Sequence, residues 1–316
     1  DASDTTLVKS LAGAGSTAVA ALQLKADSLS RQSEQLRVLA SQVHHHQIVE
    51  KLLNEVAVDD EKIDMFRAAL QIACLDNQEI DCEASLADLR RLSASIKAKL
   101  PVDANDADRL AMLDQVLFSE LGFHGSRADY YNRSNSYVNE VLDDREGIPI
   151  TLAVVYMELA KRLGVEVHGI GFPGHFLVRF DGADGNSEWI DVFERGKRLT
   201  REDLAKRYRE QTGEPLNDSH LEASTSREIL SRMLNNLLSI AIQEKDAQSM
   251  LRYLDAMLAI RPDSARSHFL RMLTARQLND VEIAKRDARW LLIQQPSGID
   301  LAMVKRLLQA IEADSE

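Results

Sequence analysis

The 316-residue sequence contains only two cysteines, Cys74 and Cys82. A disulfide framework needs more cysteines, and a separation of eight residues matches neither a zinc knuckle nor a redox pair with two intervening residues. The residues around Cys74 are apolar, which predicts a buried structural thiol, because cysteine outside disulfides is among the most buried residue types. The two cysteines therefore indicate neither metal binding nor redox chemistry.

Basic residues are scarce relative to acidic ones, since 38 Lys and Arg against 50 Asp and Glu give a formal net charge of -12. This charge repels phosphate groups and no basic block interrupts it, which argues against nucleic acid or an anionic membrane as a partner. No run approaches the ~18 apolar residues of a membrane span. We therefore expect a cytoplasmic protein. Export stays possible, because the chain starts at Asp1 rather than Met.

Aromatic residues are also few, at 5% of the chain, while long stretches are rich in Ala, Leu, Glu, Lys and Arg. This composition favours helix over strand, so we expect a mostly helical α+β protein. Residues 1–27 are rich in Ala, Ser, Thr and Gly without a stable period, which predicts a weakly ordered arm. In the helix that follows, Leu29, Leu36 and Val43 recur every seven residues and predict a face that packs on the rest of the chain or on a second copy.

Three adjacent histidines, His44, His45 and His46, are the first candidates for metal ligands. On a helix their side chains point in directions about 100° apart, which is poor geometry for binding one ion. We therefore predict a solvated or partly packed histidine cluster and expect no metal or cofactor.

The apolar pattern predicts that the first third of the chain continues as helices, with Asp60, Asp81 and Asp103 near their starts as caps or favourable charges. These helices are expected over residues 47–57, 61–75, 83–99 and 105–121.

A polar and aromatic segment, residues 129–142, precedes the most apolar helix of the sequence, and such loops often line sites. The helix is expected to begin at Pro149, which suits a first helical turn, and to end before Gly164. The residues that follow alternate in character and predict three strands, with a hairpin loop between the last two. We place the strands at residues 165–167, 175–180 and 188–193, and the loop at residues 181–185.

With this five-residue loop, Phe180 pairs with Asn186, and the same register places His175 directly opposite Asp191. Cross-strand partners share a face and lie close together, so the imidazole and the carboxylate are expected to form a hydrogen bond. A slip of one residue would separate them, so the register is a hypothesis.

Four blocks of residues in this region form a recognisable set. They are Asn135-Ser136-Tyr137, Gly147-Ile148-Pro149, Pro173-Gly174-His175-Phe176-Leu177-Val178, and the later Asp191, Phe193, Arg195, Gly196 and Leu199. Over roughly residues 60–312 the chain resembles the SirB family of transglutaminase-like proteins. The resemblance implies a core in which a helix N-terminus carries the nucleophile and two strands carry a histidine and an aspartate.

Pro149 occupies the position where active transglutaminase-type enzymes carry the cysteine, 15 residues before Gly164. Proline offers no nucleophile, and Thr151 is rotated about 200° around the helix from position 149. His175 and Asp191 remain as the matching base and orienting residue, as a vestigial or alternative site. The candidates for lining a binding cleft are Asn135, Ser136, Tyr137, Arg179 and Trp189.

The C-terminal part of the sequence repeats with a period of 34 residues, as in Asp246 with Asp280 and Pro262 with Pro296. This period is typical of tetratricopeptide repeats, which bind peptides or helices in a groove. So short an array is expected to dock on the core, and a purely structural cap is the alternative. We therefore divide the chain into an arm and helix (1–55), a transglutaminase-like domain (56–210) and tetratricopeptide-like repeats (222–316).

Three functions fit this sequence. The first is a non-catalytic interaction or regulatory protein whose cleft and repeats bind a protein or peptide. The second is a hydrolase or peptidase in which His175 and Asp191 activate water or an unexpected hydroxyl, such as that of Thr151 or Ser136. The third is a structural scaffold with a vestigial site. We favour the first, because Pro149 removes the nucleophile and the 34-residue period indicates binding. The oligomeric state cannot be predicted.

Overall fold

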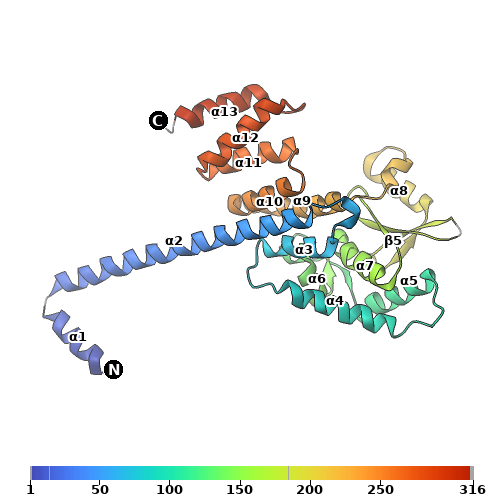
Figure 1. Ribbon diagram of the computed structural model, residues 1–316, viewed down its shortest axis with the longest axis horizontal. Helices are drawn as coiled ribbons and strands as arrows, with labels where there is room; N and C mark the ends of the chain where they lie inside the picture. Colours follow the sequence, from blue (N-terminus) through green and yellow to red (C-terminus); the bar gives the residue numbers. More distant parts are fainter. Residues whose placement is uncertain (1, 14, 184, 314–316) are drawn as a thin grey trace. The chain divides into compact units, whose positions relative to one another are not determined.

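A computed structural model describes residues 2–13, 15–183 and 185–313 of the chain (Figure 1). It is mostly helical with a small antiparallel sheet, which confirms the predicted α+β class. The chain divides into two compact units, Asp1–Gln47 and Ile48–Glu316.

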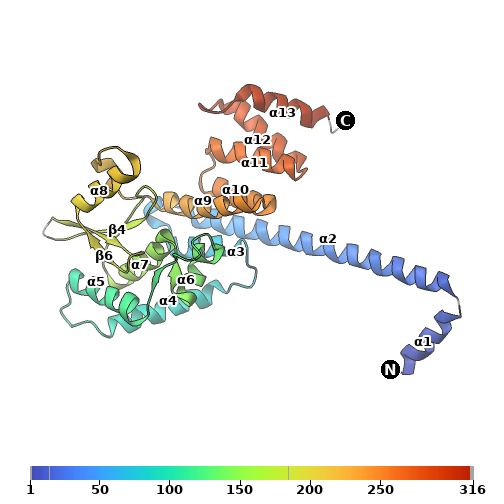
Figure 2. The same ribbon diagram turned by 180° about the vertical axis from the view of Figure 1, so that it is seen from behind.

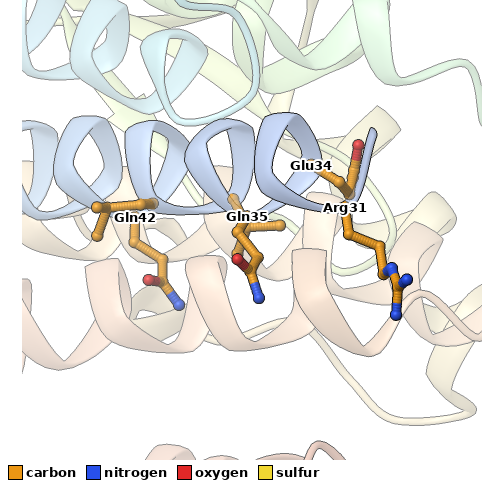
Figure 3. Close-up of a pocket in the computed structure, with 6 residues that line it drawn as sticks. Arg31, Glu34, Gln35 and Gln42 are labelled. Atoms are coloured by element: carbon orange, nitrogen blue, oxygen red, sulfur yellow. The ribbon is translucent and has the colours of Figure 1, made fainter. Parts of the chain in front are cut away.

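The first unit is formed by helix α1 (Ala2–Ala12) and most of α2 (Ser16–Glu55). The prediction of a weakly ordered arm was wrong for the described residues, because the alanines that disturb the apolar period also favour helix. Leu29, Leu36 and Val43 lie on α2 and are 53%, 66% and 50% exposed. Figure 3 shows Arg31, Gln35 and Gln42 extending from one side of α2, where a shallow hollow is bounded by this helix alone.

No single helix in the described part of the chain is long and apolar enough to cross a membrane. The length and composition criteria are satisfied only by two helical segments taken as a pair, Thr5–Ala12 and Ser16–Glu55, which are joined at a bend of 120°. His44, His45 and His46 lie together on α2, and among the described residues no group of three His, Cys, Asp or Glu could hold a metal ion.

The main unit is built around α7, whose ends are those that the sequence predicted. Pro149 is the first helical residue, and Gly164 follows the last with φ of 82°, a left-handed conformation that glycine adopts without strain. Most of α7 is buried, and its apolar residues join one large core cluster with those of several other helices. The helices between α2 and α9 are α3 (Met65–Cys74), α4 (Cys82–Lys97), α5 (Asp106–Asp114), α6 (Val138–Asp144), α7 (Pro149–Leu163) and α8 (Arg201–Thr212), with helical turns η1 (Asp60–Lys62), η2 (Gln115–Glu120), η3 (Arg133–Ser136) and η4 (Asp218–Leu221).

The predicted helix caps are only partly correct. Asp81 caps α4, as expected, but Asp64 caps α3 and Asn105 caps α5 in place of Asp60 and Asp103. Asp60 instead accepts hydrogen bonds from the backbone N–H groups of Ser226 and Arg227, at the start of a helix 166 residues further along the chain.

The sheet has four antiparallel strands in the order β3 (His168–Ile170), β4 (Leu177–Asp181), β5 (Ser187–Asp191) and β6 (Lys197–Leu199). The sheet lies between α7 and α8 (Figure 2). One face contributes Val178 and Ile190 to the large core with α7, and the other packs on α8 through residues that include Trp189. Two further short strands, β1 (His124–Gly125) and β2 (Glu146–Gly147), form a parallel pair.

The predicted hairpin register was wrong by two positions, since Phe180 pairs with Glu188 and Asp181 with Ser187. Asp181 stays in the strand because its carboxylate accepts hydrogen bonds from Ser187 Oγ (2.6 Å) and Arg179 Nε (3.1 Å). The loop is therefore residues 182–186. A shift of two leaves each side chain on its predicted face, because side chains alternate between the faces of a strand.

The C-terminal helices are α9 (Ser226–Glu244), α10 (Ala247–Ile260), α11 (Ala265–Gln277), α12 (Val281–Gln294) and α13 (Leu301–Ala313), which follow one another in a stack (Figure 2). Asp246 and Asp280, 34 residues apart, cap α10 and α12 in the same way, each accepting a bond from the N–H group three residues on. Helix α9 and part of α10 belong to the large core, whereas α11, α12 and α13 form two smaller clusters.

Candidate functional site

His175 and Asp191 form a hydrogen bond, with 2.8 Å between His175 Nε2 and Asp191 Oδ1. Asp191 is the last residue of β5 and is 0% exposed, so its carboxylate lies inside the protein. His175 lies in the turn before β4, where its N–H group donates to the carbonyl oxygen of Phe172 (3.1 Å). The partly buried guanidinium of Arg232, on α9, donates to the carbonyl oxygens of Phe172 and His175 and fixes this turn.

The carboxylate of Asp191 has further donors that the sequence did not indicate. Arg207 Nη1, on α8, lies 2.9 Å from Oδ2, and the N–H group of Glu194 lies 3.2 Å from Oδ1. Burial works to raise the pKa of Asp191, but the hydrogen bonds from His175 and Arg207 outweigh it, so the pKa lies below its ordinary value of 3.8.

The pKa shift of Asp191 predicts a stability difference that depends on pH. A carboxyl group with a depressed folded-state pKa stabilises the fold above its unfolded pKa and loses this contribution as the pH falls through the folded pKa. We therefore expect Asp191→Asn to be less stable than wild type at pH 7, with a difference that persists to about pH 4 and shrinks in stronger acid. Urea denaturation at a series of pH values measures it.

Asp218→Asn is the matched control for that series, because Asp218 also faces an arginine, Arg201, but is 86% exposed. Its stability should follow that of wild type closely at each pH. A constant difference between Asp191→Asn and wild type from pH 7 into strong acid would contradict the predicted linkage.

The chain is similar to known proteins along most of its length. A family model described as transglutaminase-like superfamily matches residues 83–235, which include His175 and Asp191. A UPF0162 protein of Xylella fastidiosa (strain 9a5c) is 33% identical over 269 residues, which cover 82% of this chain and 94% of that protein. The chain belongs to the UPF0162 family. The predicted transglutaminase-like domain is confirmed at the level of the superfamily.

Other relatives differ in how much of the UPF0162 chain they share. A UPF0162 protein of Vibrio cholerae is 25% identical over 267 residues, which cover 84% of this chain and 98% of that protein. The F-box only protein 21 of Homo sapiens is 37% identical over 169 residues, but these cover 49% of this chain and only 26% of that protein. No solved structure matches the chain.

Position 149 carries no nucleophile in this UPF0162 protein, because Pro149 is the buried first residue of α7. The two hydroxyls considered as replacements are also buried. Thr151 is 0% exposed, and its Oγ1 donates to the carbonyl oxygens of Asn135 (2.7 Å) and Ile148 (3.1 Å). Ser136 is 1% exposed. In the structure as described, neither hydroxyl is open to a substrate from solvent.

The five residues that the sequence predicted to line one cleft make three separate sets of contacts. The side chain of Asn135 donates to the carbonyl oxygen of Asp129 (2.7 Å), and its neighbour Ser136 is buried beside it. The Tyr137 hydroxyl instead donates to Asp76. Arg179 and Trp189 are cross-strand partners on the face of the sheet that packs on α8. This distribution gives no support for one cleft lined by all five residues.

A row of aromatic rings beside His175 was missed in the sequence. The ring centroids are 5.9 Å apart for His175 and Phe193, 6.4 Å for Phe193 and Tyr130, and 5.4 Å for Tyr130 and Tyr131, and all three pairs are edge-on. Tyr130 and Tyr131 are 39% and 63% exposed, so the row runs from the partly buried histidine to the surface. The polar and aromatic segment of residues 129–142 was the signal that could have indicated it.

Gly125 makes room for this row. A Cβ atom at position 125 would lie 2.3 Å from the Phe193 ring, closer than side chains tolerate, so only glycine lets the ring lie there. The parallel pairing of β1 with β2 joins Gly125 to Gly147, two residues before Pro149. Phe193 of the aromatic row therefore packs on Gly125, whose strand partner lies two residues before the start of α7.

Proposed function

We propose that this UPF0162 protein is non-catalytic and that the surface beside His175 binds a segment of a protein or peptide, with the C-terminal helices extending the contact as tetratricopeptide-like repeats. The observation that carries the proposal is the buried proline at position 149, together with buried hydroxyls at Thr151 and Ser136. Without a reachable nucleophile at any of these three positions, covalent acyl transfer of the cysteine type has no first step there.

The aromatic row supports binding as the use of the site. Tyrosine is enriched at protein interfaces, because it offers a large apolar area and a hydroxyl with little loss of conformational entropy. Tyr130 and Tyr131 present such an area beside His175, whose Nε2 is already engaged by Asp191. The similarity to a quarter of F-box only protein 21 also supports a module that functions within different chains.

The binding proposal is tested by photo-cross-linking from the site. A benzophenone amino acid replaces Tyr131 in the full-length protein, or Val102 as the control, because Val102 is a fully exposed residue outside the aromatic row. In a lysate of the source organism we expect a discrete cross-linked product from position 131 and none from position 102. Excess wild-type protein should suppress the product, and excess His175→Ala should suppress it less. Equal products from both positions would contradict the proposed surface.

Hydrolysis is the second candidate, and the intact pair of His175 and Asp191 is the observation that favours it. Purified wild type and His175→Ala are compared on a broad library of peptides and amides. We expect no turnover that depends on His175. Turnover by wild type that the His175→Ala variant loses would show that the site activates water, and the non-catalytic proposal would then fail.

A further inference from the structure

The structure brings together the only two cysteines of the sequence, whose spacing had indicated no relation. Cys74 is the last residue of α3 and Cys82 is the first of α4, and their sulfur atoms are 3.3 Å apart. No disulfide bond joins them in the structure. The contact arises from the packing of two helices across the loop of residues 75–81.

The two thiols have different surroundings. Cys74 is 4% exposed, whereas Cys82 is half-buried and can be reached from solvent. Cys82 occupies the first turn of the 16-residue helix α4, where the helix dipole favours a thiolate. The side-chain amide of Gln71 also lies 3.8 Å from Cys82 Sγ as a donor.

The pKa values of the two thiols are shifted in opposite directions. The hydrogen bond from Cys74, with help from Lys51 and Arg67 and against the effect of burial, lowers the pKa of Cys82 to about 7. Donating that hydrogen bond, together with burial, raises the pKa of Cys74. At neutral pH a large fraction of Cys82 is therefore an accessible thiolate, and it lies beside the protonated, buried thiol of Cys74.

We propose that Cys82 and Cys74 are a peroxide-reactive thiol pair, with Cys82 as the attacking thiol and Cys74 as the resolving thiol. This site is separate from His175 and does not depend on the function proposed there. The co-reactant is a hydroperoxide, of which hydrogen peroxide is the simplest.

The reaction proceeds in two balanced steps. The Cys82 thiolate attacks one peroxide oxygen, the O–O bond breaks, and Cys82 becomes a sulfenic acid while hydroxide leaves and is protonated to water. Cys74 Sγ then attacks the Cys82 sulfur, the S–S bond forms, and the S–O bond breaks as hydroxide departs with the proton of Cys74 as a second water. Two thiols are oxidised by two electrons in total, and one peroxide is reduced.

The product would link the end of α3 to the start of α4 directly beside Asp76. That carboxylate, two residues beyond Cys74, accepts bonds from Tyr137 and Tyr253. The cysteine pair therefore lies next to the contacts between the core and α10, so oxidation would change the chain at that point.

The test treats the full-length protein with hydrogen peroxide, removes the excess with catalase, and follows thiol alkylation and intact mass. We expect wild type to lose both thiols and roughly 2 Da, reversibly with dithiothreitol. Cys74→Ser should stop at a sulfenic acid that dimedone traps on Cys82, and Cys82→Ser should leave Cys74 unmodified. Serine is close in size to cysteine, and circular dichroism verifies that both variants are folded.

The wild-type protein in concentrated urea is the control that needs no variant. Formation of the intramolecular disulfide should be at least about tenfold faster in the native state, since the fold holds both sulfurs in contact. An equal rate in urea, disulfides that join two chains, or oxidation of Cys82 that stops at added oxygen without loss of both thiols would each overturn the proposal.

Discussion

Replacing Asp76 by alanine is expected to lower the free energy of unfolding by about 3–5 kcal/mol, the range found when one partner of a buried charge network is removed. Asp76 follows α3 and its side chain is 14% exposed. It accepts hydrogen bonds from the hydroxyls of Tyr137 and Tyr253 and from Arg252, whose Nη2 lies 2.7 Å from Oδ1.

The size of this effect follows from the three donor groups that would lose Asp76 as their hydrogen-bond acceptor. Burial and the Asp76 charge raise the pKa of Tyr137 and Tyr253, so both hydroxyls stay protonated and need an acceptor. Without Asp76, two buried donors and the Arg252 guanidinium lose their partner together, and an unsatisfied buried polar group is costly. Arg252 also donates to Ser249 Oγ (2.7 Å), which keeps part of its hydrogen bonding.

Urea denaturation compares Asp76→Ala with Asp76→Asn and with the control Asp59→Ala. Asparagine keeps an acceptor oxygen, so the Asn variant should lose less. Asp59 is also an acidic residue with a basic partner, Lys62, but its side chain is 79% exposed, and we expect a change within about 0.5 kcal/mol. If Asp76→Ala lost no more than Asp59→Ala, the network would not contribute to stability.

The elements that the sequence predicted well depend on local signals. Pro149 and Gly164 delimit α7 because each acts through its own backbone conformation, and Asp81 caps α4 through a donor only three residues away. The hydrogen bond between His175 and Asp191 was also predicted, although the register used to predict it was wrong by two residues and His175 lies in the turn before β4.

The features that the sequence did not predict depend on contacts between distant segments. Asp60 accepts hydrogen bonds from the first N–H groups of α9 rather than capping a nearby helix. Arg207 donates to Asp191 from α8. In both cases tertiary packing decides which donors a carboxylate meets. The contact of Cys74 with Cys82 likewise comes from how α3 and α4 pack, so a spacing of eight residues could not indicate it. Such contacts need the geometry of the whole fold.

The second large effect is the loss of stability expected when α9 is removed from the chain. Six large apolar side chains of α9 belong to the same buried cluster as α7, together with residues of α10: Ile229, Leu230, Met233, Leu234, Leu237 and Leu238. At about 1.5–3 kcal/mol for each buried side chain, their loss amounts to on the order of 10 kcal/mol, as large as the whole stability of a typical domain. Arg232, which holds the His175 turn, would be lost with them.

We therefore expect a chain that ends after Ser224 to show no cooperative unfolding transition, whereas a chain that ends after Arg261 should keep one. The longer chain retains α9 and α10 and loses only helices whose buried residues lie in the smaller clusters. Circular dichroism and urea denaturation of both chains, against the full-length protein, measure the difference. A sharp transition in the shorter chain would instead show that the core folds without these helices, as the division at residues 210 and 222 predicts, and would make the C-terminal helices a separate domain.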